Sequence, residues 1–223
     1  MSRRHSRGTH GYRVGDIEFS TDELRDLAAA WILLGIAFAV FIFSATGEPI
    51  FPDILGAITR PLFVEVFFTS LLTVGVGFLL HELAHKVVAI RYGQIAAFRA
   101  DYGMLALCVG AAFAGFLFAA PGAVYHRGRI TERQNGIVSV AGPLTNIVLA
   151  VVFLPLVLLP GVLGDIGALG VTINAILAAF NMIPFGPLDG KKVLSWSRGI
   201  FAVTFVGCAL AAITAFLFVG FPY

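Results

Sequence analysis

The stretch Phe78-Leu79-Leu80-His81-Glu82-Leu83-Ala84-His85-Lys86 decides how the chain is interpreted, because it places an H-E-x-x-H motif at the end of an apolar run that starts near Leu62. On a helix, residues four apart share a face, so His81 and His85 can offer imidazole nitrogens to one metal ion while Glu82 lies beside it. A catalytic zinc usually has three protein ligands and one open position for water. The motif therefore predicts half of a zinc site and a third ligand elsewhere in the chain.

Two histidines four residues apart can also occur by chance, or pack in a core with their nitrogens bonded to backbone carbonyls. The apolar surroundings weigh against this alternative, because each ionisable group inside a spanning segment costs roughly 2.5 to 3.5 kcal/mol on insertion scales. Chance would seldom place three such groups together, so the setting favours a metal site.

The composition indicates a polytopic membrane protein. Of the 223 residues, 58% are hydrophobic and 13% are charged, whereas a soluble domain has about 25% charged residues. The net charge of +2 is too small to indicate a nucleic-acid partner, and the basic residues are expected to mark topology instead. Cys108 and Cys208 lie in apolar stretches, where we expect small buried hydrophobes and no disulfide framework.

The first 26 residues are polar and basic, and we expect them to form a cytoplasmic segment. Its end, Ser20-Thr21-Asp22-Glu23, predicts a capping box in which the Ser20 hydroxyl and the Glu23 carboxylate bond free backbone N–H groups. A helix is therefore expected to begin at Thr21.

The basic start resembles that of a signal peptide, but the first apolar stretch begins only near Leu27 and no clear cleavage site follows it. We therefore expect a retained first span, to about Phe43, and a single membrane-embedded domain over residues 27–223. The further apolar stretches run from about Leu62 to the motif and over Met104–Ala120, Ile137–Leu159, Gly167–Met182 and Gly199–Gly220.

Asp189 is the candidate third ligand. It follows a span in the stretch Asn181-Met182-Ile183-Pro184-Phe185-Gly186-Pro187-Leu188-Asp189-Gly190. The prolines cannot continue a regular helix, and irregular backbone at membrane depth is tolerated where it lines a polar cavity. The alternative is an ordinary turn at the membrane surface, which the neighbouring Lys191 and Lys192 favour.

Three motifs occur in order: His81-Glu82-Leu83-Ala84-His85, then Gly142-Pro143-Leu144-Thr145-Asn146, then Asn181-Met182-Ile183-Pro184 leading to Leu188-Asp189-Gly190. Together they resemble the motifs of the site-2 protease family of intramembrane zinc metalloproteases, of the compact prokaryotic type without a PDZ domain. The resemblance covers about residues 62–195, the expected core of the domain. It implies one catalytic zinc ion held by His81, His85 and Asp189, with Glu82 as general base. It also implies that Asn146 helps to hold substrate or intermediate near the metal.

The asparagines have a second interpretation. The Asn146 side chain could make a polar contact between helices instead of bonding substrate or a developing oxyanion. Asn174 and Asn181 lie in an apolar segment. We expect them to form hydrogen bonds between helices, with a secondary role for Asn181 near the site.

Shared depth constrains the topology. The histidines and Asp189 can bind one ion only if their segments bring them to the same depth, and both lie toward the C-terminal ends of apolar stretches. Those helices must then run in the same direction, which requires an odd number of crossings between them. Since Ile137–Leu159 is one crossing, Met104–Ala120 should be a re-entrant or interfacial element.

Charge supports the same topology. If Met104–Ala120 does not cross, one side holds fourteen of the fifteen Lys and Arg residues and only Arg60 lies opposite; if it crosses, the split is eight to seven. The first distribution fits the positive-inside rule. We therefore expect an all-α polytopic membrane protein with five spans, although plain hydropathy would count six. A re-entrant or short β element is expected after the second helix, and the active site toward the cytoplasmic side of what we take to be the cell membrane.

The expected function is that of a zinc endopeptidase acting on transmembrane protein substrates within the lipid bilayer. A transmembrane helix hides its carbonyls in hydrogen bonds, so cleavage requires local unwinding. The substrate could pair with an exposed strand near Ala119–Tyr125 by β-augmentation. The alternative is a non-catalytic membrane metal-binding protein or transporter; the oligomeric state stays open.

The five-span topology makes a direct prediction. A reporter fused after Tyr223 should read out on the external side, and one fused at the N-terminus on the cytoplasmic side, because five crossings place the ends on opposite sides. Paired alkaline-phosphatase and fluorescent-protein fusions measure both ends. A cytoplasmic C-terminal reporter would contradict the odd number of crossings.

Overall fold

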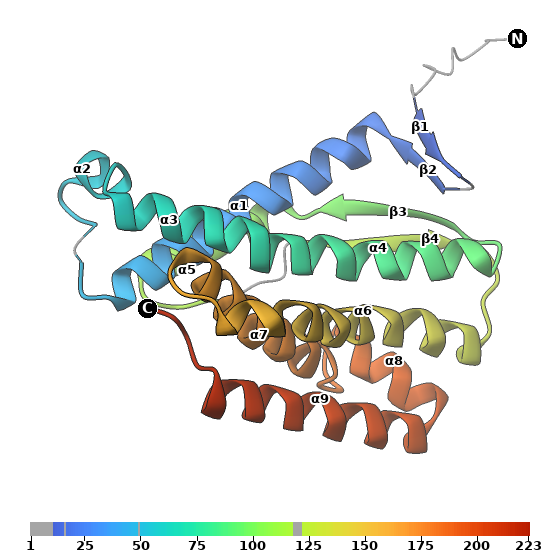
Figure 1. The fold of residues 1–223 in the computed structure, drawn as a ribbon. Coiled ribbons are helices and arrows are strands. Elements are labelled where there is room, and N and C mark those ends of the chain that lie inside the picture. The colour runs from blue at the N-terminus through green and yellow to red at the C-terminus, as the bar shows by residue number, and fades with distance from the viewer. Residues whose placement is uncertain (1–10, 16, 49, 118–121) are drawn as a thin grey trace, which may run out of the picture.

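The computed structural model describes residues 11–15, 17–48, 50–117 and 122–223, which form packed helices with two small antiparallel sheets (Figure 1). In chain order the elements are β1 (Gly11–Val14), β2 (Ile17–Ser20), α1 (Thr21–Ala45), α2 (Ile54–Ile58), α3 (Pro61–Ser70), a π-helical turn (Leu71–Gly75), α4 (Val76–Arg91), β3 (Ile95–Ala100), α5 (Tyr102–Phe113), β4 (Gly122–Arg127), α6 (Glu132–Phe153), a 3-10 turn (Leu154–Leu158), α7 (Val162–Asn181), α8 (Asp189–Trp196) and α9 (Arg198–Phe218).

Within the part of the chain that the structure describes, five helices are long and apolar enough to cross a membrane, which confirms the expected all-α polytopic fold. They are Thr21–Ala45, Pro61–Arg91, Glu132–Leu158, Val162–Asn181 and Arg198–Phe218. Of the stretch at issue, residues up to Phe113 belong to α5, and residues 118–120 lie outside the described part of the chain. The helix α5 has only 12 residues and is about 18 Å long. It cannot cross a hydrocarbon core about 30 Å thick. The short β element expected after the second span is present as β3 and β4, which pair antiparallel.

The predicted substrate-binding strand falls only partly within the described residues. Residues 119–121 lie outside them, and the described part belongs to β4, which continues two residues further, to Arg127. In β4, residues 122, 124 and 126 are half-buried, whereas residues 123, 125 and 127 are exposed. One face of the strand therefore packs on the protein.

The start of α1 agrees with only half of the capping-box prediction. The Ser20 hydroxyl accepts a hydrogen bond from the Glu23 backbone N–H at 3.2 Å, and the helix begins at Thr21 as expected. The Glu23 carboxylate, however, is buried and accepts hydrogen bonds from the Lys86 ammonium and from the Phe98 backbone N–H. A buried cation is a stronger partner for the carboxylate than its own helix end.

Lys86 ties the motif helix α4 to the beginning of the chain. Its ammonium lies 2.6 and 2.7 Å from the two Glu23 oxygens, donates to the Glu18 carbonyl at 2.7 Å, and lies 3.9 Å from the centre of the Phe19 ring. The side chain is fully buried. Lys86 is among the fourteen basic residues expected on the cytoplasmic side, and the structure shows that its charge is neutralised inside the protein.

The hairpin β1–β2 was not predicted. Its strands pair with Val14 opposite Ile17, so two residues, Gly15 and Asp16, connect them. Such a Gly-Asp pair between apolar residues is a hairpin signal, and Gly15 has a φ of 61°, which favours glycine. Two strands of four residues give only a weak alternation signal, and the surrounding polar and basic residues obscure it.

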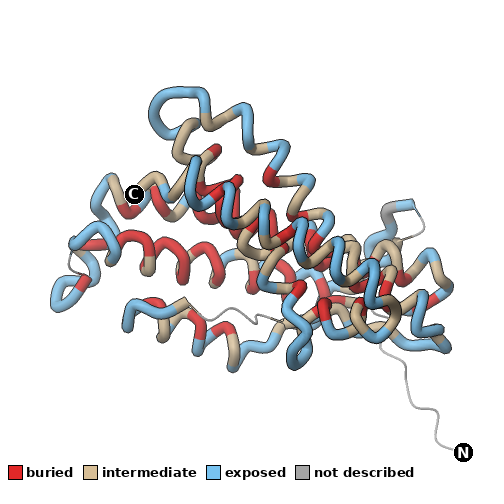
Figure 2. Tube along the Cα trace, turned by 90° about the horizontal axis from the view of Figure 1, so that it is seen from below, coloured by how far each residue is buried: buried red, intermediate tan, exposed pale blue. Residues whose placement is uncertain are grey.

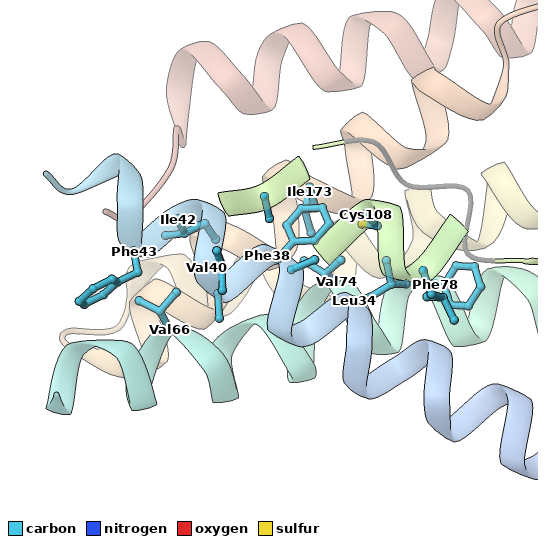
Figure 3. Packing of buried hydrophobic residues seen from close by; sticks show 14 of the residues in the cluster. Leu34, Phe38, Val40, Ile42, Phe43, Val66, Val74, Phe78, Cys108 and Ile173 are labelled. Carbon is cyan, nitrogen blue, oxygen red and sulfur yellow. The ribbon is translucent and has the colours of Figure 1, made fainter. Parts of the chain in front are cut away.

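The main core lies where α1, α3, α4 and α7 meet (Figure 3). Phe43 packs edge-on against Phe63 and Phe78 against Phe98. Cys108 is buried in this cluster and Cys208 in a second one, and both are free thiols, as predicted. Figure 2 shows the buried positions along the inward sides of the helices and the exposed positions on the outward sides.

The second span contains a π-helical turn before the motif. The Trp31 indole on α1 donates a hydrogen bond to the Leu71 carbonyl at 2.9 Å. Gly75 permits this contact, because a Cβ there would lie 2.3 Å from the Trp31 ring. The close packing of α1 on this turn fixes the helix just before it reaches the histidines.

The ion pair of Lys86 and Glu23 makes a prediction about stability. Lys86→Met leaves a buried carboxylate without its cation and should destabilise the protein by about 3–5 kcal/mol. Arg25→Met is the matched control, because Arg25 and Asp22 are exposed and 4.0 Å apart, so its effect should be about 0–1 kcal/mol. Reversible unfolding in mixed micelles measures both. Equal effects of the two substitutions would contradict the importance of the buried pair.

Candidate metal centre

The two histidines of the motif face each other across one turn of α4. Their Nε2 atoms lie 3.0 Å apart, and both side chains are buried. This is the arrangement that the four-residue spacing predicts.

Asp189 reaches the same point from the other half of the chain. Its Oδ2 lies 3.3 Å from His81 Nε2 and 3.1 Å from His85 Nε2. The chain leaves α7 at Met182, turns through residues 183–188 and re-enters a helix at Asp189. The expectation that Asp189 lies at the C-terminal end of a helix was wrong, because it is the first residue of α8. Gly190 permits the turn, since a Cβ there would lie 2.0 Å from the Met182 carbonyl oxygen.

The donor set fits zinc. His81 Nδ1 lies 2.6 Å from the Asn146 side-chain oxygen, and His85 Nδ1 lies 2.8 Å from the Val138 carbonyl oxygen. Because both partners are acceptors, each Nδ1 carries the hydrogen and each Nε2 presents a lone pair toward Asp189. Ligand distances of about 2.0–2.2 Å in a tetrahedron give ligand separations of about 3.3–3.6 Å. The observed separations are within a few tenths of an ångström of these values.

The charge of Asp189 also suits a cation. An ionised carboxylate has only acceptor lone pairs, and it adds a negative charge beside the two neutral imidazoles. Within the described residues, His81, His85 and Asp189 are the one group of side chains whose geometry could hold a metal ion.

Glu82 lies beside this group and is held from the other side. Its carboxylate accepts a hydrogen bond from the Val124 backbone N–H at 3.1 Å, so β4 lies against the motif. Glu82 and Val124 line a cavity of about 360 Å³, together with His81, His85 and Asp189.

Asn146 is buried on α6 and all of its polar atoms are engaged. Its oxygen lies against His81 Nδ1, and its amide nitrogen donates to the Gly77 carbonyl at 3.2 Å and to the Asn174 side-chain oxygen at 2.9 Å. Asn174 thus makes the hydrogen bond between helices that was expected of it. Both amide hydrogens of Asn146 are occupied in this structure, and its oxygen orients a ligand candidate.

Asn181 behaves differently from expectation. Its amide nitrogen donates to the Leu177 carbonyl one turn earlier on α7, at 2.9 Å, so the hydrogen bond found lies within one helix. The side chain lines the same cavity as the histidines. A polar side chain in a helix often bonds the preceding turn when no partner from a neighbouring helix is within reach.

Three further polar residues line the cavity that sequence reasoning did not single out: Ser139, His126 and Lys192. Burial and the charge of Lys192 lower the pKa of the His126 imidazole, so it is neutral near pH 7. Lys192 Nζ lies 3.9 Å from Asp189 Oδ1. The i to i+3 spacing of Asp189 and Lys192 on α8 could have indicated the contact between these two side chains.

Two curated proteins are similar to the chain. A protein of Methanocaldococcus jannaschii, named "Putative zinc metalloprotease MJ0611", is 47% identical over 145 residues, which cover 63% of this chain and 76% of that protein. A protein of Bacillus subtilis, named "Putative zinc metalloprotease YwhC", is 30% identical over 148 residues, which cover 55% of this chain and 66% of that protein. No family model and no solved structure matches the chain.

The contact of Gly142 with the histidines yields a test of the donor set. A Cβ at Gly142 would lie 2.5 Å from both His81 Nε2 and His85 Nε2. Gly142→Ala should therefore displace the ligand atoms and weaken zinc binding on the order of 10–100-fold. Gly207→Ala is the control, because a Cβ there meets open space. Chelator competition on purified protein measures both affinities, and unchanged zinc affinity in Gly142→Ala would show that the ion binds elsewhere.

Proposed function

The chain belongs to the zinc metalloprotease family represented by MJ0611 of Methanocaldococcus jannaschii, and from that premise we propose that it is an intramembrane endopeptidase of the site-2 protease type. Its substrates would be membrane proteins cleaved in or near their transmembrane segments. The observation that carries the proposal is that His81, Glu82 and His85 lie within a candidate span, Pro61–Arg91.

The depth of the motif supports cleavage inside the membrane. His81 lies about 30 Å along the helix from Pro61 and about 15 Å from Arg91, at 1.5 Å per residue. A hydrocarbon core is about 30 Å thick. A membrane-embedded segment could therefore reach the motif from within the bilayer.

The side chains divide the chemistry among them. His81, His85 and Asp189 would hold one zinc ion, which supplies Lewis acidity that polarises a peptide carbonyl and lowers the pKa of water toward about 7. Glu82 would accept a proton from the attacking water and deliver it to the departing amine nitrogen, so one carboxylate acts first as base and then as acid.

Asn146 is proposed as a positioning residue for His81. Its oxygen fixes the hydrogen on Nδ1, and the ring then presents Nε2 to the metal. Donation from Asn146 to substrate or to an oxyanion would first require loss of its hydrogen bond to Gly77 or to Asn174. Asn181 lines the cavity, and its amide nitrogen bonds the Leu177 carbonyl on its own helix. It is proposed as a substrate-contacting residue.

The β3–β4 sheet has one edge that can receive a substrate strand. At the outer edge of β3, the Phe98 N–H donates to Glu23 at 3.0 Å and the Ala100 N–H donates to Asp26 at 3.4 Å. The outer edge of β4 instead faces the cavity. Its Val124 N–H donates to Glu82, so a substrate strand on this edge would share or replace that bond. An unwound substrate segment could therefore add to β4 by β-augmentation and lie beside the metal centre.

Orientation, domain organisation and location are proposed from charge. The N-terminal segment up to residue 26 and the metal centre would face the cytoplasm, and residues 27–223 would act as one membrane-embedded domain in the cell membrane, with the zinc-binding core in residues 62–195. Transmembrane proteins and the lipid bilayer are the proposed partners. The transporter alternative gains no support from the described residues, whose metal-binding candidates gather at one point.

The substitution Glu82→Gln tests the proposal. It should keep zinc bound, because Glu82 is not one of the three ligand candidates, and it should abolish cleavage, because the amide cannot accept the proton. Metal analysis and cleavage of a panel of membrane-helix substrates are measured on the same preparations. His81→Ala is the companion variant, in which zinc should also be lost.

Retained cleavage in Glu82→Gln would refute the assigned base. Zinc bound without cleavage of any panel member by the wild type would instead contradict the intramembrane substrate class.

A further inference from the structure

We propose that the hydroxyl of Ser139 donates a hydrogen bond to the scissile carbonyl oxygen of the substrate as negative charge develops on it, which makes Ser139 a catalytic residue. The inference rests on the proposed protease function and deepens it. It assigns to α6 a role that neither the motifs nor the relatives indicate.

The Ser139 hydroxyl is a buried polar group that makes no hydrogen bond to the described residues. The residue is 1% exposed, and its oxygen has no hydrogen-bond partner among the described residues. Burying a hydroxyl without a partner costs about 1–3 kcal/mol. A catalytic role is one explanation for such a group, and for Ser139 its position in the cavity favours that explanation.

Ser139 lies on the face of α6 that contacts the metal centre. Ser139, Gly142 and Asn146 follow the i, i+3, i+7 spacing of one helix face. Gly142 borders both ligand nitrogens, and Asn146 bonds His81. Residues three apart have Cβ atoms about 5–6 Å from each other. The Ser139 hydroxyl is therefore one turn from the point where the ligand atoms converge.

The cavity connects this hydroxyl to the reacting groups. Ser139 lines it together with Glu82 and Asp189, so a substrate carbonyl near the metal would be accessible to the serine. The adjacent Val138 carbonyl accepts from His85 Nδ1 at 2.8 Å. That bond fixes the backbone of α6 against the ligand helix and leaves the position of Ser139 well defined.

Two other neutral donors near the site are already engaged. Both amide hydrogens of Asn146 bond Gly77 and Asn174, and the Val124 N–H bonds Glu82. A developing oxyanion needs a donor placed in advance. The buried Ser139 hydroxyl supplies one on the helix face that contacts the ligand nitrogens. His126 and Asn181 also line the cavity, and Asn181 donates one amide hydrogen to the Leu177 carbonyl. The experiment separates these residues from Ser139.

Ser139→Ala is the decisive variant, with Ser70→Ala as its matched control. Ser70 is also a fully buried serine on a spanning helix whose hydroxyl has no partner among the described residues, but it does not line the cavity. Ser139→Ala should lower kcat about 100-fold with little change in KM, because the bond forms in the transition state. Ser70→Ala should leave kcat unchanged, and Ser139→Thr should recover part of the loss.

Two readouts other than activity exclude a structural explanation. Zinc content should be the same in wild type, Ser139→Ala and Ser70→Ala. Resistance to unfolding in mixed micelles should be equal or higher in both alanine variants, since each removes an unsatisfied buried hydroxyl. A loss of stability or of zinc in Ser139→Ala that accounts for its lower rate would overturn the proposal.

The remaining outcomes are distinguishable. Unchanged kcat in Ser139→Ala overturns the proposal while the protease function stands. A loss of kcat in His126→Gln or Asn181→Ala combined with none in Ser139→Ala assigns the donor to that residue and also overturns the proposal. If the wild type cleaves no membrane-helix substrate, the protease function itself fails, and the serine proposal fails with it.

Discussion

The structure depends on one electrostatic constraint: three acceptor atoms point at one another inside a protein whose surface is apolar. The two imidazole Nε2 atoms and the Asp189 oxygen lie 3.0 to 3.3 Å apart. Without a cation their lone pairs repel, and in apolar surroundings little solvent screens them. A bound zinc ion, which this family of proteins uses, would remove this repulsion. The residues around the site hold the three acceptor atoms in place.

Each interaction around the metal centre fixes one property of the ligands, such as the tautomer of a ring or the position of a carboxylate. Asn146 and the Val138 carbonyl set the ring tautomers, Gly142 provides the space in front of the ligand nitrogens, and the short helix α8 carries Asp189 into place. The Lys86 ion pair anchors the motif helix to α1, directly after the second histidine. Rigid helices therefore determine the ligand geometry, as a site that must bind metal tightly requires.

Local patterns in the sequence were enough for the helices and the candidate ligands. Apolar stretches predicted the spans, the Ser20 cap predicted the start of α1, and the motif spacing predicted that His81 and His85 share a face. The length of α5 agrees with the topology argued from shared depth and charge. Each of these properties depends on residues close together in sequence, or on a requirement that two segments must meet.

The missed features depend on tertiary partners. Nothing local distinguishes Lys86 from a surface lysine, because its partner Glu23 lies 63 residues earlier. The same holds for Asn146, whose hydrogen bonds are defined by α4 and α7. It holds for Ser139 as well, whose hydroxyl has no hydrogen-bond partner among the described residues. Asn181 is the converse case, because its amide nitrogen bonds Leu177 on its own helix.

The π-helical turn before the motif has a consequence for the angular orientation of the whole second span. A π turn accommodates one residue more than an α-helical turn, and each residue of an α-helix advances the direction of its side chain by about 100°. The residues on either side of Leu71–Gly75 are thus out of phase with an uninterrupted helix. A single-residue deletion there would restore regular α-helical winding. It would rotate both histidines about the helix axis by a quarter-turn or more, away from α6, although all three ligand residues would remain in the sequence.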